Sequence, residues 1–210
     1  MQSEALRYVA LVTEAAVAGA EKGRVERRLK SNFDAEDRSP RLAYWPPFAG
    51  MTDREARTTG AIRRRRIGEG LAGAVFRNIL LDLWERKAAE RERLRGDRSK
   101  ISDSDLASLR ANDPWEILQQ NPRETSGAEL LVLSFREEYH SCIQVQVVKG
   151  TVGRCKIKRH PGYNLRDLMV EGSGFLEWLN VFALGTDLAL DLLLLDEPDA
   201  HLYSSLGENS

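Results

Sequence analysis

The stretch LLLLDEPDAHL, residues 192–202, carries the clearest fold signal in the chain. Its four leucines form a continuous apolar run, as the buried strands of parallel sheets do. Asp196 and Glu197 follow at once, and open α/β sheets place their ligands at the carboxyl ends of such strands. One carboxylate there can hold Mg²⁺, and the next can polarise an attacking water. The competing interpretation is a buried strand followed by an acidic turn.

A glycine-rich turn, Gly172-Ser173-Gly174, comes before the leucine run and opens a predicted helix at 175–184. The free N–H groups and the dipole of a helix N-terminus attract phosphate, and the Ser173 hydroxyl adds a further donor. The turn is therefore a candidate site for a nucleotide phosphate. The simpler interpretation is a flexible turn in which Ser173 caps the helix.

The phosphate-binding loop G-x-x-x-x-G-K-[ST] does not occur in the sequence. The glycine clusters at 68–73, 150–153 and 172–174 are not followed by Lys-Ser or Lys-Thr. Without that loop, the backbone cradle and the lysine that bind the phosphates of ATP are missing. The chain thus carries the second half of a nucleotide site without the first.

The order of a Ser-Gly turn, a helix, a strand and Asp-Glu-Pro resembles the signature motif and the Walker B strand of ABC-type ATPases. The wording DEPDAHL at 196–202 is similar to a subgroup of AAA/ABC-like ATPases that includes the overcoming-lysogenization-defect (OLD) nucleases and many phage-defence ATPases. The resemblance extends from about Leu42 to Leu202 and includes the segments 44–50 and 70–78.

This resemblance implies an α/β fold: a partial P-loop NTPase sheet of the ABC-type head with a helical insertion. It implies a homodimer arranged head to tail around two ATP molecules. Asp196 would bind Mg²⁺, and Glu197 would be the catalytic base that orients water. The Gly172–Gly174 turn would contact the γ-phosphate of an ATP held by the opposing subunit. His201 would lie near the dimer interface.

The implied activity is ATP hydrolysis that closes and opens the dimer and is coupled to DNA or to an effector. The family commonly continues with His-Pro where this chain has Tyr203-Ser204. Since the P-loop is missing, we expect either a fragment of a normal ATPase or a split subunit that works with a P-loop-bearing partner. A DNA-binding adaptor without catalysis is a third alternative.

The charge is balanced overall but unevenly distributed. The formal net charge is −1, whereas residues 61–100 hold an excess of Lys and Arg and residues 187–210 hold none. The run Arg63-Arg64-Arg65-Arg66 can engage nucleic-acid phosphates, or it can be the solvated face of a helix. The second interpretation is favoured, because no aromatic residues are interleaved for base stacking.

Two cysteines and three scattered histidines predict neither a disulfide framework nor a zinc centre. No apolar stretch approaches the roughly 20 residues of a membrane span, and residues 1–30 lack a signal-peptide layout. We therefore expect a cytoplasmic protein with reduced thiols and no membrane partner.

The resemblance implies three regions: an N-terminal helix and connecting segment of the ATPase head at 1–67, a helical insertion at 68–122, and the C-terminal half of the head at 123–210. The expected helices are 3–30, 71–95, a short one up to residue 110 capped by Ser102 or Asp103, 115–120 and 175–184. A turn-rich segment is expected at 121–129. The expected strands are 42–45, 130–135, 143–147 and 152–158, with a hairpin turn at 149–150, followed by the leucine run.

Overall fold

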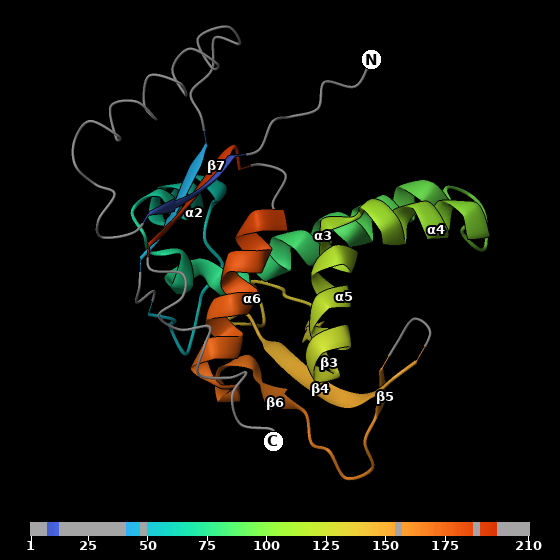
Figure 1. The fold of residues 1–210 in the computed structure, drawn as a ribbon. Helices are drawn as coiled ribbons and strands as arrows, with labels where there is room; N and C mark the ends of the chain where they lie inside the picture. The colour runs from blue at the N-terminus through green and yellow to red at the C-terminus, as the bar shows by residue number, and fades with distance from the viewer. Residues whose placement is uncertain (1–7, 13–40, 47–49, 154–156, 187–189, 197–210) are drawn as a thin grey trace, which may run out of the picture.

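The computed structural model describes residues 8–12, 41–46, 50–153, 157–186 and 190–196, and within them the chain has an α/β fold. The strands fall into two sheets, one parallel and one antiparallel. Helices lie beside and between the two sheets (Figure 1).

The parallel sheet has the leucine run at its centre. This strand, β7 (Leu192–Asp196), lies between β1 (Tyr8–Val12) and β2 (Leu42–Trp45). Both neighbours run parallel to it, with Val12 opposite Asp196. Since β7 has a neighbouring strand at each edge and its leucines are buried or nearly so, an unbroken apolar sequence is what this position requires. The predicted strands at 42–45 and at the leucine run are confirmed.

The predicted helix at 3–30 is wrong where the structure describes it, because residues 8–12 form strand β1. Their sequence, YVALV, is apolar and partly β-branched, so it suits a buried strand as well as one face of a helix. The partner that decides between the two is β7, far away in the sequence. The remainder of 3–30 lies outside the described residues.

Two short helices contact strand β2. They are α2 (Gly60–Gly68), which begins at an N-cap formed by Thr59, and the 3₁₀ helix η2 (Ala72–Val75). The long helix α3 (Phe76–Arg95) follows directly, so the helix predicted at 71–95 is confirmed apart from its 3₁₀ first turn. Its first half is buried, and its second half extends away from both sheets together with α4 (Asp103–Asn112) (Figure 1).

Side-chain caps fix where the next two helices begin. The Ser102 hydroxyl accepts from the Asp105 N–H at the start of α4, as the sequence predicts. The Asp113 carboxylate accepts from two N–H groups at the start of α5 (Pro114–Ser126). The turn-rich segment predicted at 121–129 is wrong, because α5 continues through Pro122 to Ser126. Pro122 is buried, and this packing offsets the backbone hydrogen bond that a proline removes from a helix.

The second sheet is antiparallel and contains β3 (Ala128–Val132), β4 (Val145–Val152), β5 (Ile157–Arg159) and β6 (Arg166–Asp167). The alternating sequence around Val145 and Val147 predicts β4 correctly, since these side chains are buried while their neighbours are more exposed. The predicted hairpin is present, but its turn is not at 149–150. Strand β4 continues to Val152 and pairs with β5 through residues 150–152.

Gly150 lies inside this hairpin for a steric reason. A Cβ atom at Gly150 would lie 2.1 Å from the backbone oxygen of Lys158 and 2.6 Å from Cγ2 of Ile157. Strand β5 therefore crosses β4 at a distance that only a residue without a side chain permits. The glycine that the sequence suggests as a turn residue is in fact a site of close backbone approach.

Strand β3 forms an edge of the antiparallel sheet, and a side chain covers part of that edge. The Gln119 amide of α5 donates to the Leu130 carbonyl at 2.6 Å and accepts from the Leu130 N–H at 2.9 Å. Gln119 is buried, and so is Leu130. The amide thus takes the place that a neighbouring strand would occupy at this residue.

Helix α6 (Ser173–Thr186) completes the core. It packs against α3 and α5, and its buried face includes Leu176, Leu179 and Ala183. A single cluster of buried side chains includes residues of both sheets and of helices α3, α5 and α6. Among the described helices, none has the length and apolar character needed to cross a membrane.

Candidate functional site

Asp196 is the last residue of β7, so its carboxylate lies at the carboxyl end of the middle strand of the parallel sheet. It is half-buried, and the Tyr44 hydroxyl of β2 donates a hydrogen bond of 2.9 Å to its Oδ2. Burial raises the pKa of Tyr44, and the bond to Asp196 raises it further, so the phenol keeps its proton at neutral pH. Tyr44 therefore holds the carboxylate in one orientation while Oδ1 has no hydrogen-bond partner among the described residues.

The acidic and thiol side chains in the described part of the chain form no group of three that would cage a metal ion. A magnesium ion in a nucleotide site does not need such a cage, because it is held by one or two carboxylates together with phosphate oxygens and water. A lone, oriented carboxylate such as Asp196 fits that donor set. Glu197, the predicted catalytic base, and His201, which the resemblance places near the dimer interface as a candidate catalytic residue, lie outside the described residues.

The Gly172–Gly174 turn opens helix α6 as predicted. Ser173 is the first helical residue, and the first backbone bond of the turn runs from the Leu176 N–H to the Gly172 carbonyl. Ser173 is exposed and does not serve as the N-cap, because the residue before the helix is Gly172. The N–H groups of the first helical turn have no partner within the helix, so they are open to an anion.

The Gly172–Gly174 turn and Asp196 belong to different elements, since the turn opens α6 and Asp196 ends β7. No hydrogen bond or ion pair in the described ranges joins Gly172, Ser173 or Gly174 to the carboxylate. Helix α6 packs against α3 and α5.

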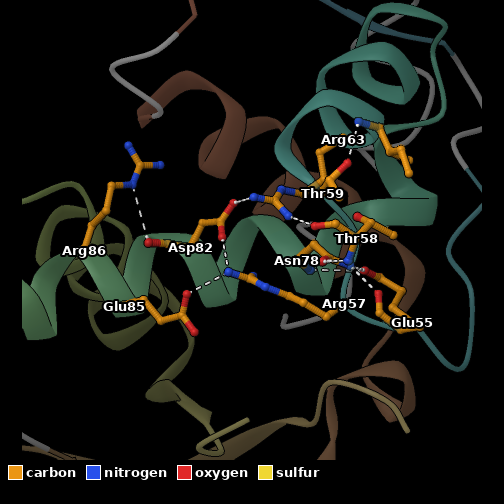
Figure 2. A network of polar contacts seen from close by, with 11 residues as sticks. Glu55, Arg57, Thr58, Thr59, Arg63, Asn78, Asp82, Glu85 and Arg86 are labelled. Atoms are coloured by element: carbon orange, nitrogen blue, oxygen red, sulfur yellow. Dashed lines mark hydrogen bonds and ion pairs between the residues drawn. The ribbon is translucent and has the colours of Figure 1, made fainter. Parts of the chain in front are cut away.

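A polar network ties the segment 53–59 to the start of α3 (Figure 2). Glu55 is only 4% exposed, and its carboxylate accepts from the backbone N–H groups of Arg77 and Asn78 and from the Asn78 side chain. The first-turn N–H groups of α3 thus obtain their acceptor from a residue that is remote in sequence. The side chain of Asn78 in turn donates to the Ala56 carbonyl and accepts from the Thr58 N–H.

Charged residues extend the network along α3. Asp82 binds both Arg57, at 2.8 Å, and Arg63, at 2.6 Å, and Arg57 also contacts Glu85 at 2.7 Å. On the other side of the helix start, Arg77 is 2% exposed and forms two hydrogen bonds with Asp167, of 2.6 and 3.1 Å. Residues 77–78 thus brace the start of the long helix through these contacts. This network holds the loop between β2 and α2 in place.

Burial raises the pKa of Glu55 above the ordinary value of 4.5, and the N–H donors of Arg77 and Asn78 oppose this shift. A group with a raised folded-state pKa stabilises the fold fully below its unfolded pKa, and this contribution is lost as the pH rises through the folded pKa. We therefore expect the wild type to lose stability relative to Glu55→Gln as the pH rises above 4.5. Urea unfolding of both proteins between about pH 4 and 7 measures this difference. If the wild type instead gained stability relative to the variant over that range, the pKa of Glu55 would be lowered by folding and the prediction would be wrong.

The four arginines at 63–66 do not act as one surface. Arg63 is bound by Asp82 and Arg65 by Glu69, both through ion pairs. Arg64 is exposed and Arg66 half-buried, and neither has an ion-pair partner in the described part of the chain. The helical interpretation of this run is confirmed, and only two of its four charges are uncompensated.

A groove of about 660 Å³ lies between the second half of α3 and α4. Trp84 and Leu106 contribute apolar surface, and Lys87, Arg91 and Lys100 contribute positive charge. Its lining comes from 84–106 alone and includes neither Asp196 nor the Gly172–Gly174 turn. This hollow is separate from the candidate nucleotide residues.

Sequence reasoning did not identify Glu55 and Tyr44 as partners in these sites. Glu55 lies in a polar loop where nothing local marks it as buried, and the N–H groups that donate to it are more than 20 residues away. Tyr44 lies in the predicted strand at 42–45. If that strand had been paired with the leucine run, the alternation of side chains could have placed Tyr44 on the same face of the sheet as Asp196.

Comparison of the chain with models of protein families, with curated proteins and with solved structures found no match in any of the three.

Proposed function

We propose that this chain supplies part of an ATP-hydrolysing site of the ABC type, with a sheet that belongs to the P-loop NTPase class. The observation that carries the proposal is the position of Asp196. It ends the middle strand of a parallel sheet, with its carboxylate oriented by Tyr44. Carboxylates at this position in open α/β sheets serve bound nucleotides. The exposed N-terminus of α6 at the Gly172–Gly174 turn supplies a second phosphate-binding element.

In this proposal each residue has one task. Asp196 holds Mg²⁺, which when bound neutralises phosphate charge. Glu197 accepts a hydrogen bond from the attacking water and orients it. The N–H groups of the Gly172–Gly174 turn and the Ser173 hydroxyl bind the γ-phosphate of a nucleotide on the opposing subunit. In this arrangement two chains share each nucleotide.

The proposed site needs a P-loop, and residues 1–210 contain none, so a second chain is one source of that loop. A partner would then supply the loop and its lysine, and this chain would supply the Walker B carboxylates and the signature turn. In this form the active species is a complex of the two chains, coupled to DNA or to an effector.

The test is phosphate release from ATP and Mg²⁺ by this chain mixed with a candidate P-loop partner. We expect activity in the mixture that exceeds the sum of the two separate proteins. Glu197→Gln should lower turnover by roughly 100-fold or more while fluorescent ATP still binds, because the change removes the base and keeps the shape.

Glu138→Gln is the matched control, since Glu138 is exposed and has no ion pair in the described part of the chain. This variant should keep full activity. Gly172→Ala tests the signature turn. A Cβ at Gly172 meets no atom of the described residues within 4 Å, so a loss of activity would point to contact of the turn with a bound nucleotide. An active mixture whose turnover does not change with Glu197→Gln would overturn the assignment of the base.

A further inference from the structure

The sequence between Glu138 and Asp167 contains no Asp or Glu and has a strong excess of positive charge. Its Lys and Arg residues are Lys149, Arg154, Lys156, Lys158, Arg159 and Arg166. The whole chain has 31 Lys and Arg against 32 Asp and Glu, but within this segment no acid offsets the basic residues. It forms β4, β5 and the start of β6.

The acids that border this segment in the fold are already bound. Asp167 pairs with Arg77 at 2.6 Å, Glu129 with Arg123 at 2.7 Å, and Glu171 with Lys149 at 2.7 Å. By contrast, Lys158 and Arg159 are exposed, and no acid of the described part of the chain pairs with either of them. Their charges are therefore available to a partner.

The backbone presents these cations on a two-stranded ribbon. Strand β3 pairs with β4 only up to Lys149, and β5 alone pairs with residues 150–152. The ribbon formed by 150–152 and 157–159 thus extends beyond the main sheet (Figure 1). Since successive residues of a strand point to opposite faces, Lys158 and Arg159 place a charge on each face of the ribbon.

Beside the ribbon, Arg166 is exposed and its guanidinium lies 5.8 Å from the centre of the Tyr163 ring. The aromatic ring restricts the arginine without neutralising its charge.

We infer that the β4–β5 ribbon binds the phosphate backbone of double-stranded DNA. A two-stranded ribbon fits the major groove of B-form DNA, which is about 12 Å wide and has phosphates along both walls. Cations on both faces of the ribbon match those two walls. The deep, narrow major groove of A-form RNA does not admit such a ribbon. Binding is independent of sequence, because Lys and Arg here contact phosphates and no base-reading side chain is required.

The proposed DNA-binding ribbon lies on other residues than the proposed ATP site, and it binds another class of ligand. The ribbon contains neither Asp196 nor the Gly172–Gly174 turn. DNA binding is measured without nucleotide, so its failure and the failure of the ATPase proposal are distinguishable.

The experiment measures the binding of the full chain to a fluorescent DNA duplex by anisotropy over a series of salt concentrations. If roughly three phosphates are neutralised, by Lys158, Arg159 and Arg166, the logarithm of the binding constant should fall with the logarithm of salt with a slope of about −3. The double variant Lys158→Gln/Arg159→Gln should reduce the magnitude of this slope by about 2 and weaken binding at least tenfold at about 100 mM salt.

The matched control is Arg64→Gln/Arg66→Gln, which removes two uncompensated arginines of α2 and the same net charge. It should bind DNA like the wild type. Thermal unfolding of both double variants checks that they fold like the parent protein. An equal loss of affinity in both double variants would show an effect of overall charge and would overturn the assignment to the ribbon.

Two further ligands separate other sources of phosphate. Duplex RNA of the same length and vesicles of phosphatidylserine and phosphatidylcholine are tested with the same proteins. Weaker binding to both than to the DNA duplex is expected. Preference for the vesicles or for RNA that depends on Lys158 and Arg159 would overturn the proposal, and so would the absence of salt-dependent DNA binding.

Discussion

Replacing Glu55 with alanine is expected to lower the free energy of unfolding by about 4 kcal/mol. The carboxylate accepts three hydrogen bonds, from the backbone N–H groups of Arg77 and Asn78 and from the Asn78 side chain. All three donors belong to buried residues, so water cannot replace the lost acceptor without an opening of the loop. Each buried donor left without a partner costs about 1–3 kcal/mol. Urea unfolding followed by circular dichroism measures the change.

The matched control is Glu69→Ala. Glu69 forms an ion pair with Arg65 four residues earlier at 2.8 Å, and both side chains are well exposed. Solvent screens such an exposed pair, so it contributes little and the control should stay close to the wild type. Equal effects of the two substitutions would mean that Glu55 does not hold the start of α3.

The second large effect is expected for Gly150→Ala, at about 3 kcal/mol of lost stability. The added methyl group would meet the Lys158 backbone oxygen at 2.1 Å and Ile157 Cγ2 at 2.6 Å. The first of these is a backbone atom, so relief requires β5 to move away from β4. We expect hydrogen exchange to increase at Val152 and Ile157 before the rest of the sheet is affected.

Gly50→Ala is the corresponding control, since a Cβ there has no atom within 4 Å and the backbone is not in the left-handed region. It should be neutral or slightly stabilising, because alanine restricts the unfolded chain. If Gly150→Ala were equally neutral, β5 would not lie across β4 as described. Because this substitution displaces the ribbon, it should also weaken DNA binding without removing any charge.

Local sequence signals were sufficient for several elements. The apolar stripe of α3 ends near Trp84, and the helix continues to Arg95 as predicted. Ser102 and Asp113 mark helix starts because their short side chains accept from N–H groups two or three residues later. The alternation of apolar and polar residues predicts β4 correctly, because one face of this strand is buried and the other is more exposed.

The errors share a different physical cause. The strand at 8–12 depends on a partner in β7, and no short window of sequence contains both strands. Pro122 is a helix breaker by local rules, yet it is buried within α5. Gly150 suggests a turn, but the close approach of β5 requires it. Each of these outcomes is decided by tertiary contacts, which override local preference.

The candidate site was predicted only in part. The leucine run, Asp196 and the turn at 172–174 were identified from the order of their residue types along the chain: a Ser-Gly turn, a helix, an apolar strand and then acidic residues. Tyr44 and Glu55 were not, since each acts through a partner that is remote in sequence. The ribbon cations were missed for another reason: the long basic segment at 61–100 is more conspicuous, although many of its charges are paired within the fold.

The Gln119 amide has a consequence beyond the stability of one molecule. With its amide in place, the backbone of β3 at Leu130 offers no free N–H or carbonyl to a neighbouring molecule. If the amide were lost, that edge would become a template on which a second chain can add a strand, and then a third. A single side chain of α5 thus occupies, at Leu130, the hydrogen-bonding position through which a second chain would begin to add a strand.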